Sequence, residues 1–349
     1  MISPKIDGDM QTFLESKPQT ESIWRSVILF GRNVASYKFA LGKSLLELAD
    51  KETNFVSMED LAEPFSRHIS EHLKINDNQG TSQSSRFLNK ARDYNKGDCS
   101  KSDLLSTTVS LGFNNVIDAF HVVGGGDVPE RFFMDERTER KGILITDNLL
   151  KLKEHFQFSN FSHEVEARWR LVETAWSLKI SPHLLEVRHD LGDNILFTEN
   201  DLSRRINITS SRDSLNGYQK GKCFYCRKGI RIEKSSDGEI VDVDHFFPHT
   251  LLTELPEVNI NGVWNLVLAC QECNRGTGGK FERIPKIQFL ERLHARNEYL
   301  INSHHPLRET IINQTGKDTP KRIKFLQQMD QKALDIIPTR WSPPEAHEG

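Results

Sequence analysis

Apolar residues recur at helical intervals over most of the first half of this chain. In the segment 21–50 they are spaced three or four positions apart, which predicts an amphipathic helix that bends or breaks at Gly31 or Gly42. Serines that precede apolar runs predict the starts of later helices, because a serine hydroxyl caps the first free N–H groups of a helix. These predicted helices cover residues 57–73, the segment from Ser85 onward, residues 104–122 with Ser102 as cap, and residues 162–178.

Strand patterns are short and few. Residues 142–146 predict a strand that leads into a helix capped by Thr146 or Asp147, and residues 184–198 predict a hairpin that turns at 191–194. The three glycines at 124–126 lack the Lys-Ser/Thr of a phosphate-binding loop and predict a flexible turn.

The remainder of the chain predicts a short helix near 210–218 and more helices after Gly279. One of these follows Pro285, and the last opens at Thr319-Pro320. The predicted fold class is therefore α+β and mainly helical. We expect three parts, which are a helical recognition or regulatory region at 1–200, a central domain at 201–285 and C-terminal helices at 286–349 that pack on the central domain.

Composition limits the possible functions. The chain has 349 residues and a formal net charge of −3, so no overall basic field indicates nucleic-acid binding. No apolar run approaches the length of a membrane span, and five cysteines without a disulfide pattern suit the reducing cytoplasm. We therefore expect a soluble, cytoplasmic protein without a secretion signal.

Two Cys-x-x-Cys pairs lie in the central domain, at Cys223/Cys226 and Cys270/Cys273. Four thiolates in two such pairs can close a tetrahedral zinc site in which all four ligands come from the protein. This zinc would be structural, since no coordination position remains open for chemistry. A zinc knuckle that only binds nucleic acid or another protein is an alternative that the cysteines alone leave open.

Polar residues with catalytic potential lie within and just after this segment. Asp244 and His245 are adjacent, Asn265 follows them, and Asn274 comes directly after the last cysteine. A histidine titrates in the right range to accept a proton from water, and a carboxylate with an amide oxygen suits Mg²⁺ or Mn²⁺. His249 is either a further ligand or phosphate contact or, as we expect, a bystander.

Basic residues gather on both sides of these polar residues, where they could hold a phosphate backbone. The alternative is a charged face that only contacts solvent. The residues that we expect to bind nucleic acid are Lys222, Arg227, Lys228, Arg275 and Lys280.

The sequences DHFFP, NLVLAC and CQECN occur in order over residues 220–285 and resemble the cysteine-bearing branch of the HNH endonuclease family. The resemblance implies a zinc-stapled ββα-metal core, in which a hairpin carries the Asp-His pair and a helix carries the last polar residue. It implies that His245 is the general base and that Asn265 holds the loop and orients the histidine. It also implies that Asp244 and Asn274 bind the catalytic cation, with Asn274 in the third position where the family name has histidine.

The predicted function is thus a metal-dependent endonuclease that hydrolyses DNA, with RNA not excluded. By analogy with the family, we expect a bacterial restriction or antiphage-defence effector that works with a separate sensor or activator subunit. Two alternatives remain. One is a non-catalytic, zinc-stabilised nucleic-acid-binding subunit of a larger complex, and the other is an indiscriminate nuclease toxin.

Overall fold

The computed structural model describes twelve segments of the chain and divides it into two compact units. These units are Thr20–Pro182, which we call the helical unit, and in the main His183–Gly349, which we call the cysteine unit. The division lies before the boundary near residue 200 that the sequence predicts. The described residues are 20–30, 35–49, 54–80, 85–123, 125–155, 157–178, 187–190, 195–199, 205–216, 219–232, 241–302 and 307–343.

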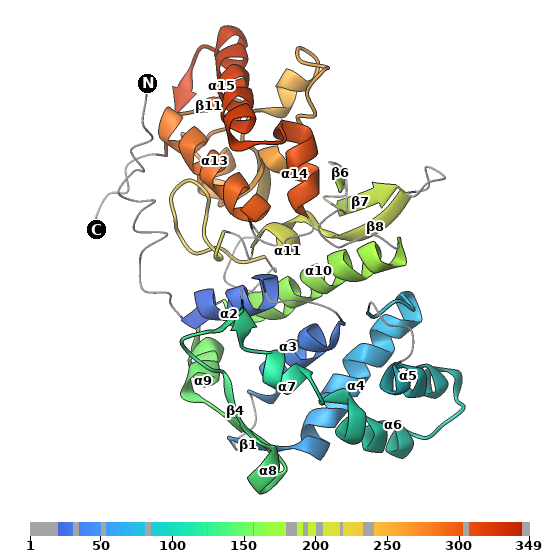
Figure 1. The fold of residues 1–349 in the computed structure, drawn as a ribbon. Coiled ribbons are helices and arrows are strands. Elements are labelled where there is room, and N and C mark those ends of the chain that lie inside the picture. The colour runs from blue at the N-terminus through green and yellow to red at the C-terminus, as the bar shows by residue number, and fades with distance from the viewer. Residues whose placement is uncertain are drawn as a thin grey trace. The chain divides into compact units, whose positions relative to one another are not determined.

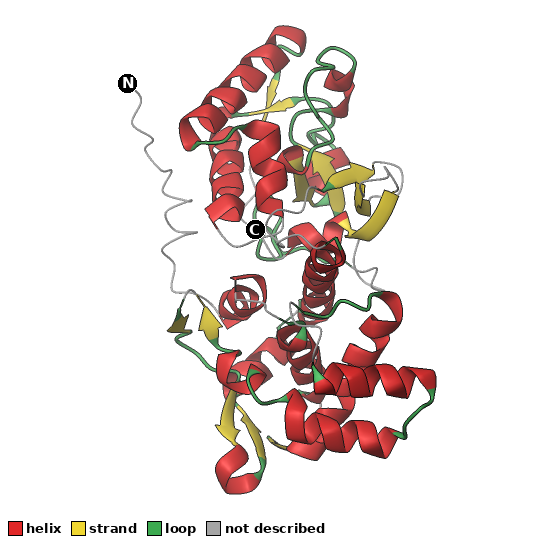
Figure 2. Cartoon of the chain, turned by 45° about the vertical axis from the view of Figure 1, so that its right-hand side comes forward, coloured by secondary structure: helices red, strands yellow, loops and turns green. Residues whose placement is uncertain are grey.

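Helices dominate the helical unit, and its strands are short (Figures 1 and 2). The helices are α2 (Thr20–Phe30), α3 (Tyr37–Leu48), α4 (Met58–Ile75), α5 (Arg86–Lys96), α6 (Lys101–Thr107), the π-helical turn η1 (Thr108–Gly112), α7 (Val116–Ala119), α8 (Arg137–Arg140), α9 (Asp147–Glu154) and α10 (Phe158–Ser177). The strands are β1 (Phe55–Ser57), β2 (Val122–Val123), β3 (Gly126–Asp127), β4 (Phe133–Glu136) and β5 (Gly142–Ile145). They form an antiparallel β1-β5-β4 sheet and a β2-β3 pair.

Large aromatic side chains form the core of this unit, in which α3 packs against both α4 and α10. Trp24, Phe39 and Trp169 are fully buried, and the rings of Phe39 and Trp169 stack with centroids 6.0 Å apart. Gly42 lies inside α3, where an added Cβ would come within 3.1 Å of Ile28 Cδ1. Glycine at this position thus lets α2 and α3 approach closely, and it does not break the helix.

The predicted helix at 21–50 is two helices, because α2 ends at Phe30 and α3 begins at Tyr37. Gly31, one of the two expected break points, lies outside the described residues. By contrast, the helices predicted from Ser57 and Ser85 are confirmed. Each of these serines accepts a hydrogen bond from a backbone N–H of the first turn.

The helix predicted at 104–122 is wrong in its start and its length. Its cap is Ser100 and not Ser102, since Ser100 Oγ accepts from Asp103 N and the Asp103 carboxylate accepts from Ser100 N. The chain then widens into the π-helical turn η1, and residues 122–123 are a strand. An apolar pattern that predicts one long helix therefore covers α-helix, a π-helical turn and a strand.

The cysteine unit combines three small sheets with a group of C-terminal helices (Figure 1). Its strands are β6 (Arg188–Asp190), β7 (Ile195–Glu199), β8 (Arg205–Ser210), β9 (Asp242–His245), β10 (Leu266–Ala269), β11 (Ile284–Pro285) and β12 (Arg340–Trp341). Its helices are α11 (Ser211–Asn216), the 3₁₀ turns η3 (His249–Leu252) and η4 (Val263–Asn265), α12 (Gln271–Arg275), α13 (Ile287–Asn302), α14 (Leu307–Thr315) and α15 (Thr319–Ile336). The sheets are the antiparallel β6-β7-β8 sheet, the antiparallel β9-β10 pair and the parallel β11-β12 pair.

Several sequence predictions for this unit are confirmed. Strands β6 and β7 pair antiparallel as the expected hairpin, although its turn at 191–194 lies outside the described residues. The last helix begins at Thr319, where the Asp318 side chain accepts from Lys321 N. The fold is thus α+β and mainly helical, and no helix among the described residues is long and apolar enough to cross a membrane.

Candidate metal centre and active site

The four paired cysteines come together in space. The Sγ atoms of Cys223, Cys226, Cys270 and Cys273 all lie within 4.8 Å of one another, and those of Cys226 and Cys270 are 3.7 Å apart. Sulfur atoms around a tetrahedral zinc ion, with Zn–S distances of about 2.3 Å, lie about 3.8 Å apart. The cluster therefore fits a metal ion such as zinc. Among the described residues, no other group of three or more His, Cys, Asp or Glu side chains meets in this way.

Backbone hydrogen bonds shape both cysteine pairs into turns that point their thiols at one centre. Cys223 N donates to Lys228 O at 2.8 Å, and Cys270 N donates to Cys223 Sγ at 3.4 Å. The hydrogen bond with the Cys223 thiol lowers the pKa of Cys226 to about 7. A thiol that ionises near neutral pH suits metal binding, because the thiolate is the ligand.

A two-stranded hairpin followed by a short helix connects this cluster to the polar residues. Strand β9 carries Asp244 and His245, which lie opposite Val267 and Leu266 of β10. The second cysteine pair lies at the start and within α12, directly after β10. Phe224 N donates to Leu268 O at 2.9 Å, so the first cysteine pair is also tied to β10.

Asn265 joins the two ends of the loop between β9 and β10. It is fully buried at the end of η4, and its Oδ1 accepts from Phe247 N at 2.8 Å. Its Nδ2 donates to Phe247 O and to Ile260 O, both at 2.9 Å. These contacts connect the two ends of the loop through Asn265, while the side chain that contacts the His245 ring is another asparagine.

That asparagine is Asn261, whose Oδ1 lies 3.0 Å from His245 Nε2. Because a carbonyl oxygen only accepts, Nε2 carries the hydrogen and Nδ1 is left with a lone pair. Burial lowers the pKa of His245 to about 3, and the neighbouring His189 and His249 lower it as well. The imidazole is therefore neutral at neutral pH.

Asp244 is 7% exposed and has hydrogen-bond donors on both carboxylate oxygens. Tyr225 Oη donates to Oδ2 at 2.6 Å, and Lys280 Nζ donates to Oδ1 at 3.1 Å. Burial raises the pKa of Asp244 and lowers that of Lys280, while the ion pair between the two opposes both shifts.

The side chain of Asn274, which was expected to bind a cation together with Asp244, contacts Asp242. Its Nδ2 donates to Asp242 Oδ2 at 3.0 Å, and Arg275 Nε donates to the same oxygen at 2.9 Å. A cation that bound the carboxylate of Asp244 would have to compete with Tyr225 and Lys280, which each donate a hydrogen bond to one of its oxygens.

The basic residues expected to bind nucleic acid are placed in different ways. Lys222 and Lys228 are exposed, Arg227 is half-buried, and Arg275 is exposed while paired with Asp242. Lys280 is fully buried, so a surface contact between Lys280 and a phosphate is not what the structure shows. The physical reason is that the ammonium of Lys280 is used inside the unit, on Asp244.

Two arginines of α13 donate hydrogen bonds to backbone carbonyl groups near the site, a role that the sequence pattern did not reveal. Arg292 Nη1 donates to Phe224 O at 2.6 Å and to Tyr225 O at 2.9 Å. Arg296 donates to Leu266 O and to Trp264 O, both at 2.9 Å. The sequence signal for this role was their spacing of four residues on an apolar face of the helix. A buried arginine usually donates to carbonyl or carboxylate groups, because a buried charge needs partners.

Two polar residues of the site were also missed, Tyr225 and Asn261. Tyr225 lies between the first two cysteines, and Asn261 lies four residues before Asn265. Neither has a spacing that marks it in advance. Their partners become visible only when the hairpin and the first cysteine pair are brought together.

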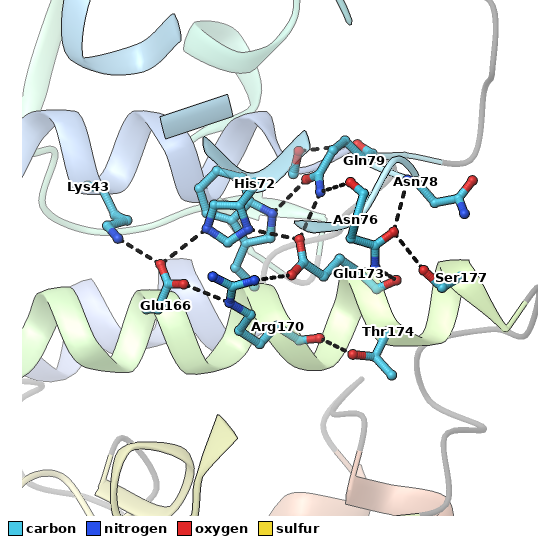
Figure 3. Close-up of polar contacts among 12 residues, drawn as sticks. Lys43, His72, Asn76, Asn78, Gln79, Glu166, Arg170, Glu173, Thr174 and Ser177 are labelled. Atoms are coloured by element: carbon cyan, nitrogen blue, oxygen red, sulfur yellow. Dashed lines mark hydrogen bonds and ion pairs between the residues drawn. The ribbon is translucent and has the colours of Figure 1, made fainter. Parts of the chain in front are cut away.

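A second polar cluster lies inside the helical unit (Figure 3). His72 of α4 stacks on Trp169 of α10, with parallel rings 3.4 Å apart. Its Nδ1 lies 2.8 Å from Glu173 Oε2, and its Nε2 lies 3.2 Å from Glu166 Oε2. Burial lowers the pKa of His72, but the two carboxylates outweigh burial and leave it raised.

Further side chains close this network, so that its charges are balanced from several elements (Figure 3). Lys43 of α3 pairs with Glu166 at 2.7 Å, and Arg170 pairs with both glutamates. Gln79 Nε2 donates to Glu173 Oε2 at 2.8 Å. The carboxylates thus have partners on three helices and one loop, an arrangement that joins elements and leaves little for a ligand.

No protein-family model, curated protein or solved structure matches this chain. The function must therefore be argued from the residues of the chain itself.

Proposed function

We propose that this protein is an endonuclease that hydrolyses phosphodiester bonds of DNA. The observation that carries the proposal is the placement of His245, whose Nε2 lies 3.0 Å from Asn261 Oδ1, on the hairpin next to the cysteine cluster. With Nε2 directed at Asn261, Nδ1 is the ring nitrogen that we propose takes a proton from water. The ring lies in a hairpin that the cysteine cluster ties to α12, so its position depends on rigid neighbours.

In the proposed reaction, Nδ1 of His245 accepts the proton of the water that attacks the phosphorus. The bond between the phosphorus and the 3′ oxygen breaks, and the leaving 3′ oxygen takes a proton from solvent, which gives a 3′-hydroxyl and a 5′-phosphate. Asn261 keeps the tautomer and the ring orientation, and Asn265 holds the loop on which Asn261 lies. The exposed cations Lys222, Lys228 and Arg275 are proposed to contact the phosphate backbone.

We propose that Asp244 and Asn274 bind a Mg²⁺ or Mn²⁺ ion only if the side chains around them rearrange. This rearrangement would require Tyr225 and Lys280 to release the carboxylate of Asp244. We therefore assign no step of the reaction to a divalent cation. The zinc that we propose for the four cysteines has a structural role.

The test is cleavage of a supercoiled plasmid by the zinc-loaded protein, in Mg²⁺, in Mn²⁺ and in a chelator that leaves the zinc in place. We expect nicking by the wild type and its loss in His245→Ala, with zinc content and melting temperature retained. His294→Ala is the matched control, because His294 is a half-buried histidine on α13 with Glu298 as its neighbour. Equal nicking by His245→Ala would overturn the role of His245.

A folded, zinc-loaded protein that binds DNA but never cuts it would instead support the non-catalytic binding subunit. Unspecific cutting of many DNA and RNA substrates, with toxicity on expression that His245→Ala relieves, would support the toxin. Restriction or antiphage defence in the cytoplasm, aided by a sensor subunit, is the biological role that we propose for a nuclease of this kind.

A further inference from the structure

The ammonium group of Lys280 lies in a cage of oxygen atoms. Nζ donates to Asp244 Oδ1 at 3.1 Å, to His245 O at 2.7 Å and to Phe281 O at 3.3 Å. The side chain is fully buried. One carboxylate and two carbonyl oxygens are the kind of donors that a hard cation takes, so this is a cation site that the chain fills with its own positive charge.

Backbone hydrogen bonds determine the position of Lys280 next to these oxygen atoms. Lys280 N donates to Cys273 O at 2.7 Å, and Phe281 N donates to Asn274 O at 2.8 Å. A glycine-rich turn precedes the lysine, and an added Cβ on Gly279 would come within 2.9 Å of Gly276 backbone atoms. The cysteine pair on α12 therefore determines where the lysine side chain begins.

The residue after Lys280 adopts a conformation that L-residues rarely take. Phe281 has φ 48° with its side chain 54% exposed, so little packing offsets this strain. The strained backbone places the Phe281 carbonyl oxygen against Lys280 Nζ. Strained backbone of this kind is found at functional sites, where the surrounding contacts hold it in place.

Electrostatics favour a single cation at this position. The pair of Asp244 and Lys280 is neutral when both groups are charged, and Tyr225 occupies the other carboxylate oxygen. A divalent ion that entered beside the ammonium would face like charge at hydrogen-bond distance, in a buried site where screening is weak. The two cations therefore exclude each other.

We propose that Lys280 is the resident cation of this site, and that a divalent cation binds Asp244 only when the lysine ammonium has left. The first part of this proposal, that the ammonium of Lys280 occupies the cation site, rests only on the observed contacts. Its consequence for the reaction, that the wild type cleaves without a divalent cation on Asp244, rests on the proposed function.

The test is Mn²⁺ binding to the zinc-loaded full chain, followed by the electron paramagnetic resonance signal of free Mn²⁺. Lys280→Met removes the ammonium but keeps the length of the side chain. We expect this variant to bind Mn²⁺ at least tenfold more tightly than the wild type. Adding Asp244→Asn to it should abolish the gain, because the carboxylate is the only charged oxygen of the cage.

Two outcomes would overturn the proposal. The first is a wild-type Mn²⁺ site that depends on Asp244 and is as tight as that of Lys280→Met. The second is a folded Lys280→Met that gains no Mn²⁺ site. If Lys280→Met does not fold, Lys280→Gln takes its place, since its amide keeps a donor but no charge. Its melting temperature should then rise with Mn²⁺ while that of the wild type does not.

These measurements separate this proposal from the proposed function. A wild type that never cuts DNA would end the nuclease proposal but leave the Mn²⁺ contrast as it is. A wild type that cuts DNA and binds Mn²⁺ tightly through Asp244 would keep the nuclease and end the role of Lys280.

Discussion

The helical unit and the cysteine unit each bury a carboxylate beside a cation and an aromatic ring, but they hold these groups in different ways. In the helical unit, Glu173 lies on a helix of 20 residues, and His72 lies on one of 18. In the cysteine unit, Asp244 lies on a four-residue strand that pairs with another of four. Elements this short have little core of their own.

The two units obtain their rigidity from different kinds of contact. Long helices with buried aromatic rings keep His72 and Glu173 in place through ordinary packing. The short hairpin of the cysteine unit relies instead on the cysteine cluster and on arginines of α13 that bind its carbonyl groups. We therefore expect removal of the metal to destabilise the cysteine unit and to leave the helical unit folded. We expect removal of a buried charge to lower the stability of the two units to different extents.

The largest effect should come from Cys270→Ser. Metal binding in such clusters contributes about 10–16 kcal/mol to folding, so the loss of one thiolate should unfold the region around β9 and β10. Hydrogen exchange followed by mass spectrometry should show lost protection there and unchanged protection in α3, α4 and α10. A fully protected Cys270→Ser protein without zinc would contradict the structural role of the metal.

Glu173→Gln should have the next largest effect, confined to the helical unit. It removes one buried charge and leaves His72 and Arg170 without their full partner, which typically costs about 3 kcal/mol of unfolding free energy. Urea unfolding of the full chain measures this cost. Glu63→Gln is the matched control, since the pair of Glu63 and Lys101 is exposed and its loss should leave the urea midpoint unchanged.

The same network predicts how the stability of the helical unit depends on pH. The pKa of Glu166 is lowered because His72 and Lys43 outweigh its burial, so its contribution is lost as pH falls below about 4.5. The pKa of His72 is raised, so its contribution is complete below about 6.5 and is lost as pH rises through the raised value. The melting temperature of this unit should therefore be highest between about pH 4.5 and pH 6.5, where both contributions are present.

Replacement of His72 by glutamine sharpens this test. The His72→Gln protein should lose the alkaline part of the pH dependence and be less stable at pH 5.5. An unchanged alkaline fall in melting temperature would assign that fall to another group. The cysteine unit serves as the internal reference, because it does not contain this network.

The smallest effect should come from Phe281→Gly in the cysteine unit. Glycine adopts φ 48° without steric cost, so the substitution should stabilise the unit by up to about 1 kcal/mol. Phe281→Ala keeps the Cβ and should bring no such gain. A loss of stability in Phe281→Gly, measured by thermal unfolding, would show that the ring packs more than its exposure indicates.

Several elements could be predicted because their signals are local in the sequence. The serine caps of α4 and α5, the start of α15 and the hairpin of β6 and β7 follow from side chains within a few residues of each backbone group they serve. The pairing of the four cysteines into one cluster was also predictable, because two short Cys-x-x-Cys turns form ligand sets by themselves.

Which polar groups lie within hydrogen-bond distance depends on the tertiary structure. Asn261 reaches His245 across the loop, Lys280 reaches Asp244 from the end of a glycine-rich turn, and Asn274 pairs with Asp242. These contacts join residues 16 to 36 positions apart, and no periodic pattern specifies them. The reason is physical: a buried charge takes the partner that the packing of the chain brings within hydrogen-bond distance, and that distance is set by the whole fold.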